Sequence, residues 1–174
     1  MTQSPNGSDP KTAGAQPGGH LSLSQLLPTE RIALDVKVST WQEAVRAAGR
    51  LLHDTGVVTV EYIEAMVKVA EELGPYIAIA PGIALPHAST EAGARQTGLS
   101  FVRLAAPVNF GNPDNDPVRV LFALAAVDKD AHMLALKALA ELFLSKDLMA
   151  KLAAARDKRA VIEILREAEK MAEN

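Results

Sequence analysis

The hydrophobic and polar positions of this chain form two kinds of repeat, and the first kind indicates β-strands. Every second residue from 32 to 38 is apolar, as in a strand with one buried face. The run 118–127 (VRVLFALAAV) is almost entirely apolar, which suits a central strand covered on both faces. The short apolar stretches are 31–38, 76–80, 82–85, 98–104 and 118–127.

The second kind of repeat places apolar residues three or four positions apart and indicates helices. Ser39 or Thr40 fits the N-cap of one helix, with Glu43 completing a capping box and Gly56 ending it. Asp128 or Asp130 is a natural N-cap for a later amphipathic helix. The expected helices are a short one in 21–28, then 39–56, 59–74, 131–144, 147–154 and 158–171.

Strands mingled with helices predict the α/β class, as a three-layer sandwich whose mixed sheet is flanked by helices on both faces. Residues 1–20 are rich in Gly, Pro, Ser, Thr and Asn, so we expect a disordered N-terminal tail. One domain should fill 21–174, because no repeat or second linker interrupts it and 174 residues suit one compact domain.

Composition refines this prediction mainly by exclusion. The chain has no cysteine, which rules out disulfides, zinc–thiolate sites and thiol catalysis. Its formal net charge is −3 and it has no long basic run, so we expect no nucleic acid partner. No apolar segment approaches the roughly 18 residues of a membrane span, and the N-terminus lacks the plan of a signal peptide. We therefore expect a cytoplasmic domain without direct membrane insertion.

The four histidines are the first candidates for chemistry. His20 lies in the tail and His53 near the end of a helix, where both are expected to face solvent. His87 lies in GIALPHAST (82–90), just past an apolar run, and ligands gather at such strand ends in α/β sheets. Pro86 restricts the direction of the chain there. With an ordinary pKa of about 6.5, the His87 ring could accept and release a group, or could simply pack.

His132 adds weight to the functional interpretation. It falls in the first turn of the helix after Asp128, where free backbone N–H groups and the helix dipole attract anions. The dipole disfavours a charged imidazole unless an anion lies between them, so a phosphate explains His132 better than an exposed position does. Ser89 and Thr90 follow His87 and can donate hydrogen bonds to the same anion.

Other chemistries lack their sequence motifs. The chain has no H-x-H, no H-E-x-x-H and no carboxylate cluster with ligand spacing, so we expect no metal site. It also lacks the G-x-S-x-G turn of a hydrolase, a P-loop and a G-x-G-x-x-G fingerprint. We therefore expect no bound cofactor.

The run YIAIAPGIALPHAST (76–90), followed by DKDAH (128–132), resembles the enzyme IIA components of the bacterial phosphoenolpyruvate-dependent sugar phosphotransferase system. The similarity is to the mannitol/fructose/nitrogen-type superfamily, EIIA type 2, and covers residues 21–168. The stretches ELGPYIAIAPGIALPHA and FGNPDNDPV are most similar to the ascorbate-type branch.

The resemblance implies a sheet of about five strands and a phosphotransferase role. His87 would be the phosphoacceptor, forming a tele-phosphohistidine with a phosphoryl group from the phosphocarrier HPr and passing it to a IIB component for sugar uptake through IIC. His132 would help to hold the phosphoryl group. The sugar, ascorbate or another, is left open. The alternative is a nitrogen-type regulatory protein whose phosphorylation state controls binding to transporters or kinases.

One position departs from the mannitol-type pattern, and the role of one loop stays open. Mannitol-type members carry an arginine on the helix ahead of the motif, whereas Lys68 is the nearest cation here, so Lys68 substitutes or this branch does without. The loop 109–117 either borders the site or serves only as a turn. Ile83 and Leu85 are expected to form part of a flat docking face for partners.

Overall fold

The computed structural model describes residues 15–16 and 20–172. The predicted disordered tail falls mostly on residues outside this range, 1–14 and 17–19, so it stays a prediction. The described parts near the N-terminus are two short strands, β1 (Ala15–Gln16) and β2 (His20–Leu21), which pair antiparallel.

The main sheet has five strands in the order β3-β6-β7-β5-β4 and is mixed, as predicted. Its strands are β3 (Ile32–Val36), β4 (Ala78–Ala80), β5 (Ile83–Ala84), β6 (Gly98–Val108) and β7 (Val118–Ala125). The outer pair β3 and β6 runs parallel, and so does β5 with β7, whereas β6–β7 and β4–β5 are antiparallel. The nearly unbroken apolar run was therefore correctly predicted to be a central strand, because β7 has neighbours on both sides.

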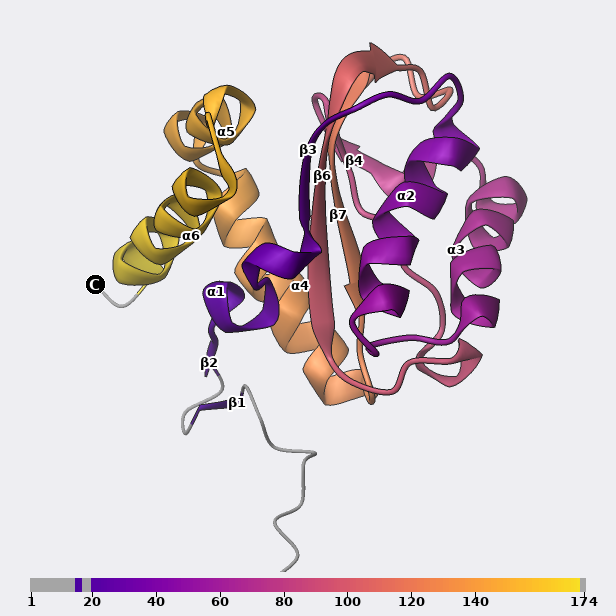
Figure 1. The fold of residues 1–174 in the computed structure, drawn as a ribbon, viewed down its shortest axis with the longest axis horizontal. Coiled ribbons are helices and arrows are strands. Elements are labelled where there is room, and N and C mark those ends of the chain that lie inside the picture. Colours follow the sequence, from indigo (N-terminus) through magenta and orange to yellow (C-terminus); the bar gives the residue numbers. More distant parts are fainter. Residues whose placement is uncertain (1–14, 17–19, 173–174) are drawn as a thin grey trace, which may run out of the picture.

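Helices cover both faces of the sheet, which confirms the sandwich (Figure 1). One face carries the two long helices of the first half of the chain. The other face carries the C-terminal helices and a short N-terminal one, and each face packs around its own apolar cluster. The helices are α2 (Trp41–Asp54) and α3 (Val60–Leu73) on the first face, then α1 (Leu23–Leu26), α4 (Lys129–Phe143), α5 (Lys146–Ala154) and α6 (Lys158–Ala172) on the second.

The boundaries of α2 follow from the predicted capping residues. The Thr40 hydroxyl accepts a hydrogen bond from the Glu43 amide at 3.2 Å, and the Glu43 carboxylate accepts one from the Ser39 amide at 2.8 Å. At the other end Gly56 adopts a φ of 80°. This conformation lets the Gly56 and Val57 amides reach back to carbonyls of the last turn, as in a Schellman motif.

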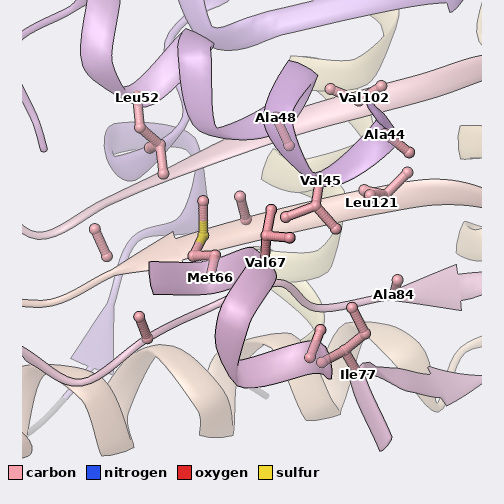
Figure 2. Packing of buried hydrophobic residues seen from close by; sticks show 14 of the residues in the cluster. Ala44, Val45, Ala48, Leu52, Met66, Val67, Ile77, Ala84, Val102 and Leu121 are labelled. Carbon is pink, nitrogen blue, oxygen red and sulfur yellow. The ribbon is translucent and has the colours of Figure 1, made fainter. Parts of the chain in front are cut away.

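The core between α2, α3 and the sheet consists mostly of small and branched aliphatic side chains (Figure 2). A Cβ at Gly49 on α2 would lie 2.9 Å from the Met66 methyl group and 3.0 Å from Ile63, both on α3. A glycine at this point therefore allows the two helices to approach closely. The close approach fixes where the first residues of α3 lie, and one of them reaches the histidine segment.

Several strand limits differ from those predicted. β6 continues to Val108, beyond residue 104, because its antiparallel pairing with β7 extends to the Val108–Val118 pair. β5 keeps only Ile83 and Ala84 of the stretch 82–85. These limits were missed because they depend on neighbouring strands and not on local sequence.

Arg103 is one of two buried polar residues in the described part of the chain, and it anchors the C-terminal layer. Its guanidinium donates to the carbonyl oxygens of Leu152, Ala153 and Ala155, at the end of α5, and lies 3.5 Å from the Asp35 carboxylate. The carbonyls at a helix C-terminus lack partners within the helix and carry partial negative charge. Arg103, on β6, therefore supplies hydrogen bonds to the carbonyl oxygens at the end of α5.

Replacing Arg103 by alanine should lower the free energy of unfolding by about 2–4 kcal/mol, because it leaves a cavity and unpaired buried carbonyls. Urea unfolding followed by circular dichroism measures this change. Arg159→Ala is the control, since its side chain is 87% exposed and pairs only within α6. Equal stability of the two variants would contradict the anchoring role.

Candidate functional site

The backbone of His87 lies beside the end of the central strand. After β5 ends at Ala84, the chain continues along β7, and the Leu124 amide donates to the Pro86 carbonyl at 2.9 Å. His87 and Leu124 form an isolated parallel bridge. The prediction that His87 lies just past a strand end is therefore confirmed.

The His87 ring is held in one orientation by its own segment. Nδ1 lies 2.8 Å from the Leu85 carbonyl oxygen, and the ring is half-buried. A carbonyl oxygen can only accept, so Nδ1 carries the proton of the neutral ring and Nε2 keeps a free lone pair. The arrangement therefore leaves Nε2 as the ring nitrogen with an available lone pair.

His132 comes from α4, which covers one face of the sheet, and lies against His87. Asp128 caps α4, since its carboxylate accepts from the Ala131 amide at 2.8 Å, and this places His132 in the first turn as predicted. The centroids of the two imidazole rings are 5.6 Å apart and their planes are inclined by 47°. The structure thus brings together the two histidines that were singled out from the sequence.

The neutral form of His132 is favoured at this position. Burial lowers the pKa of His132, and the charge of His87 lowers it further. The lowered pKa favours an uncharged His132 ring with one N–H donor at neutral pH. An anion between the rings would favour protonation and oppose this shift.

The remaining predicted residues differ in their positions. Ser89 is exposed, and its hydroxyl oxygen accepts from the Glu91 amide at 3.4 Å, at the start of a 3-10 turn over Thr90–Ala92. This contact leaves the Ser89 O–H free to donate. The predicted solvent-facing position of His53 is partly confirmed, because its side chain is 40% exposed beside Asp54. The side chain of His20 lies outside the described residues.

The loop 109–117 lies away from the histidines. It leads into the start of β7, whereas His87 lies near the end of that strand. The Asp116 carboxylate accepts from the backbone amides of Phe110 and Gly111 at 2.7 and 2.8 Å, and Nδ2 of the Asn115 side chain donates to the Ala78 carbonyl at 2.7 Å. Turn formation and contacts with the edge strand β4 therefore account for the polar residues of this loop.

The expectation of a docking face at Ile83 and Leu85 is wrong. Both side chains are buried, 5% and 3% exposed, because β5 lies inside the sheet and they pack in the cluster beneath the C-terminal helices. The exposed large apolar residues nearest to His132 in sequence are instead Val127, just before α4, and Met133, which follows His132. Their exposed fractions are 36% and 63%.

Lys68 is the other residue that the sequence left ambiguous. Its side chain is 74% exposed on α3 and lies 3.9 Å from the Glu72 carboxylate. The two alternatives, that Lys68 substitutes for the arginine of mannitol-type relatives or that this branch does without one, both stay predictions.

Sequence analysis missed Tyr62. This residue of α3 is 1% exposed, and its hydroxyl accepts from the Ala88 amide at 3.1 Å and donates to the Leu124 carbonyl at 2.8 Å. Burial raises the pKa of Tyr62. In an amphipathic helix a tyrosine looks like any core residue. The available signal was that a buried hydroxyl needs a polar partner, in a chain with only two tyrosines.

Two classes of site lack support within the described part of the chain. In residues 20–172, no group of three or more His, Cys, Asp or Glu side chains is placed to hold a metal ion. None of the helices described is long and apolar enough to cross a bilayer.

Comparison with known proteins agrees with this geometry. The family model described as "Phosphoenolpyruvate-dependent sugar phosphotransferase system, EIIA 2" matches residues 25–168. Over 141 residues the chain is 37% identical to the ascorbate-specific PTS system EIIA component of Escherichia coli (strain K12), covering 80% of this chain and 92% of that protein.

Solved structures give the same result. The mannitol-specific cryptic phosphotransferase enzyme IIA CmtB from Escherichia coli matches at 34% identity and a TM-score of 0.75, over 83% of this chain and 98% of that one. Enzyme IIA in a complex with phosphorylated enzyme IIB of the Escherichia coli mannitol system matches at 29% identity and a TM-score of 0.72, over 82% and 99%.

A five-stranded α/β sandwich with two facing histidines and this family match defines a phosphotransfer component. The chain belongs to the EIIA type-2 family of the phosphoenolpyruvate-dependent sugar phosphotransferase system, as a phosphocarrier of that system.

The pKa of His132 provides a test of the site geometry. In the folded protein it should lie below the ordinary value of about 6.5, and His87→Asn should raise it while burial keeps it below that value. NMR titration of the imidazole resonances measures both effects. His53→Gln should leave the His132 titration unchanged, and an equal response to both substitutions would contradict the pairing.

The same shift makes stability depend on pH. Because the unfolded chain protonates at His132 at higher pH than the folded chain does, the free energy of unfolding should fall as pH drops below about 6.5. Urea unfolding at a series of pH values should show a smaller fall in His132→Gln than in the unsubstituted protein.

Proposed function

We propose that His87 is the phosphoacceptor and forms a phosphohistidine at Nε2. The observation that carries the proposal is the hydrogen bond from Nδ1 to the Leu85 carbonyl at 2.8 Å, which leaves the lone pair of Nε2 available for attack. A neutral imidazole is a competent nucleophile near neutral pH. The match to the family model supports a phosphoryl group as the group that His87 transfers.

The transfer from the phosphocarrier HPr balances without a cofactor. A bond forms between Nε2 of His87 and phosphorus, while the bond from phosphorus to the donor imidazole nitrogen breaks and its electron pair returns to that ring. The His87 ring keeps its Nδ1 proton and gains positive charge. The Leu85 carbonyl then accepts from a more acidic N–H, so this hydrogen bond strengthens as the phosphoryl group arrives.

We assign stabilisation of the transferred group to His132 and the start of α4. In phosphoryl transfer, negative charge is spread over the equatorial oxygens, and donors aimed at them lower the barrier. The neutral His132 ring can donate one N–H. The amides of Ala131 and His132 already have partners around Asp128, so the first-turn amides available to the anion are those of Lys129 and Asp130. Ser89 and Thr90 are further proposed donors.

The proposed partners are HPr as donor and a IIB component, acting with IIC, as acceptor. Support for IIB comes from the similar enzyme IIA that was solved in complex with phosphorylated enzyme IIB. Exposed Val127 and Met133, which lie on either side of His132 in sequence, are the apolar part of the proposed docking face. Such encounters are transient, and surrounding charges affect their rate more than their affinity.

We further propose that the protein acts in the cytoplasm in sugar uptake, with ascorbate as the first substrate to test. The 37% identity to an ascorbate-specific component supports that choice. Transfer of phosphate from this chain to a cognate IIB component would distinguish uptake from a regulatory role, in which phosphorylation would instead change binding to a transporter or kinase.

Incubation with phosphoenolpyruvate, enzyme I and HPr should add one acid-labile phosphate to the protein, and His87→Ala should abolish it. Intact-mass measurement counts the phosphate, and phosphorus NMR should show the shift of an Nε2 phosphohistidine. His53→Ala is the control and should label normally. Labelling that persists in His87→Ala would contradict the proposal.

Substitution of His132 by alanine should leave phosphorylation possible but slow it by roughly 10- to 100-fold, because one donor to the transferred group is lost. Rapid-quench measurement with phosphorylated HPr gives the rate. An unchanged rate would show that His132 does not stabilise the transferred group.

Met133→Glu should raise the KM for phosphorylated HPr, because it places a charge in the proposed apolar docking face. Met171→Glu is the matched control, since that methionine is 56% exposed on α6 and belongs to no proposed surface. Equal KM values for the two variants would place the docking face elsewhere.

A further inference from the structure

We infer that Tyr62 is a positioning residue for phosphoryl transfer: its hydroxyl replaces one hydrogen bond of the strand ladder at His87 and thereby fixes the direction of the His87 ring. The inference rests on the proposed role of His87 as phosphoacceptor. Tyr62 lies on α3, in the layer opposite α4, and its hydroxyl bonds to backbone groups of Ala88 and Leu124.

The pattern of a parallel ladder shows what the hydroxyl replaces. When His87 lies opposite Leu124, a regular ladder has two hydrogen bonds, from the Leu124 amide to the Pro86 carbonyl and from the Ala88 amide to the Leu124 carbonyl. The first is present at 2.9 Å. In place of the second, the Ala88 amide donates to the Tyr62 hydroxyl at 3.1 Å, and that hydroxyl donates to the Leu124 carbonyl at 2.8 Å.

The insertion has a geometric consequence at His87. On the N-terminal side the segment is held directly against β7 through Pro86. On the C-terminal side it is held one oxygen atom further away through Tyr62. The chain therefore diverges from the sheet at the residue that carries the reactive ring. Both sides of the divergence are fixed, which leaves the His87 Cα–Cβ bond little freedom.

The surroundings of Tyr62 make this arrangement rigid. The residue is 1% exposed, so water does not compete for its hydrogen bonds. The start of α3 also holds the segment after His87 a second time, because the Thr59 amide donates to the Gly93 carbonyl at 3.0 Å. Gly93 has a φ of 133°, which strains any other residue, and a Cβ there would collide with the Thr59 hydroxyl.

Removal of the hydroxyl has two possible structural results, and both displace His87. Either the Ala88 amide closes directly onto the Leu124 carbonyl, which draws the segment toward β7, or both groups stay buried and unpaired. A shift on the order of 1 Å at a reacting group is enough to slow a reaction by roughly 100-fold. The docking face around Met133 lies on the other layer and should be unaffected.

The test is Tyr62→Phe, which keeps the aromatic ring and deletes only the hydroxyl. We expect the maximal rate of phosphoryl transfer from phosphorylated HPr to fall roughly 10- to 100-fold with an unchanged KM. Proton–nitrogen NMR of the His87 imidazole should show a shifted Nδ1–H resonance. If Tyr62 only stabilised the fold, the maximal transfer rate per folded molecule would stay unchanged. The Nδ1–H resonance of His87 would also stay unchanged.

Ser100→Ala is the matched control. Ser100 is fully buried, and its hydroxyl donates to the Ala48 carbonyl at 2.8 Å, so the variant also loses one hydroxyl-to-carbonyl bond on the α2 and α3 side of the sheet. It should lose stability while transferring phosphate at the unsubstituted rate. Equal loss of rate in Ser100→Ala and Tyr62→Phe would attribute the effect to stability and overturn the inference.

The outcomes separate this inference from the proposed function. Normal transfer in Tyr62→Phe, with no transfer in His87→Ala, would overturn the role of Tyr62 and leave His87 as phosphoacceptor. Labelling of His87→Ala would overturn the proposed function itself.

A second measurement applies if Tyr62→Phe does not fold. Incorporation of 3-fluorotyrosine into a Tyr76→Phe background keeps both hydrogen bonds but strengthens donation and weakens acceptance at Tyr62. The exposed Tyr76 is removed so that only one tyrosine is changed. A changed transfer rate together with a shifted His87 Nδ1–H resonance supports positioning, and unchanged values of both overturn it.

Discussion

The hydrogen bond from the Leu124 amide to the Pro86 carbonyl joins the histidine segment to the central strand of the sheet. β5 contributes only two residues to the sheet, and this hydrogen bond carries its register on to the segment that follows the strand. The register that it sets brings His87 to the end of β7, which is also where the chain enters α4. The juxtaposition of the two histidines is therefore a consequence of strand pairing.

Each layer of the sandwich has a separate part in this arrangement. The sheet supplies the backbone position of His87, and α4 supplies His132 from one side. From the other side α3 supplies the buried hydroxyl of Tyr62. The close approach of α2 and α3 at Gly49 belongs to the same arrangement, because it determines where α3 begins. A substitution in the core between these helices can thus affect the site without any contact with it.

The parts of the structure that were predictable from sequence are those determined by local chemistry. Thr40 and Gly56 act as helix caps because their side chain or backbone conformation suits the helix ends, whatever packs nearby. The proline–histidine motif and the capped helix that carries His132 were recognisable for the same reason, and family resemblance linked them. The pairing of the two rings follows from the fold that the resemblance implied.

What sequence analysis missed depends on contacts between distant segments. The apolar character of Ile83 and Leu85 fits a docking face as well as a core, and only the position of β5 inside the sheet decides for the core. The hydroxyl of Tyr62 acquires its role from two backbone groups that lie far away in sequence. Turn residues in the loop 109–117 gave no indication of which end of β7 they would occupy.

The tether between Nδ1 of His87 and the Leu85 carbonyl has a consequence for the order of events. Because it keeps Nδ1 turned inward, a phosphoryl group carried by His87, as proposed above, would arrive and depart at the same nitrogen, Nε2. The protein that delivers the group and the protein that collects it then need the same space. Their binding is therefore mutually exclusive, and in each cycle the donor protein must dissociate before the acceptor protein can bind.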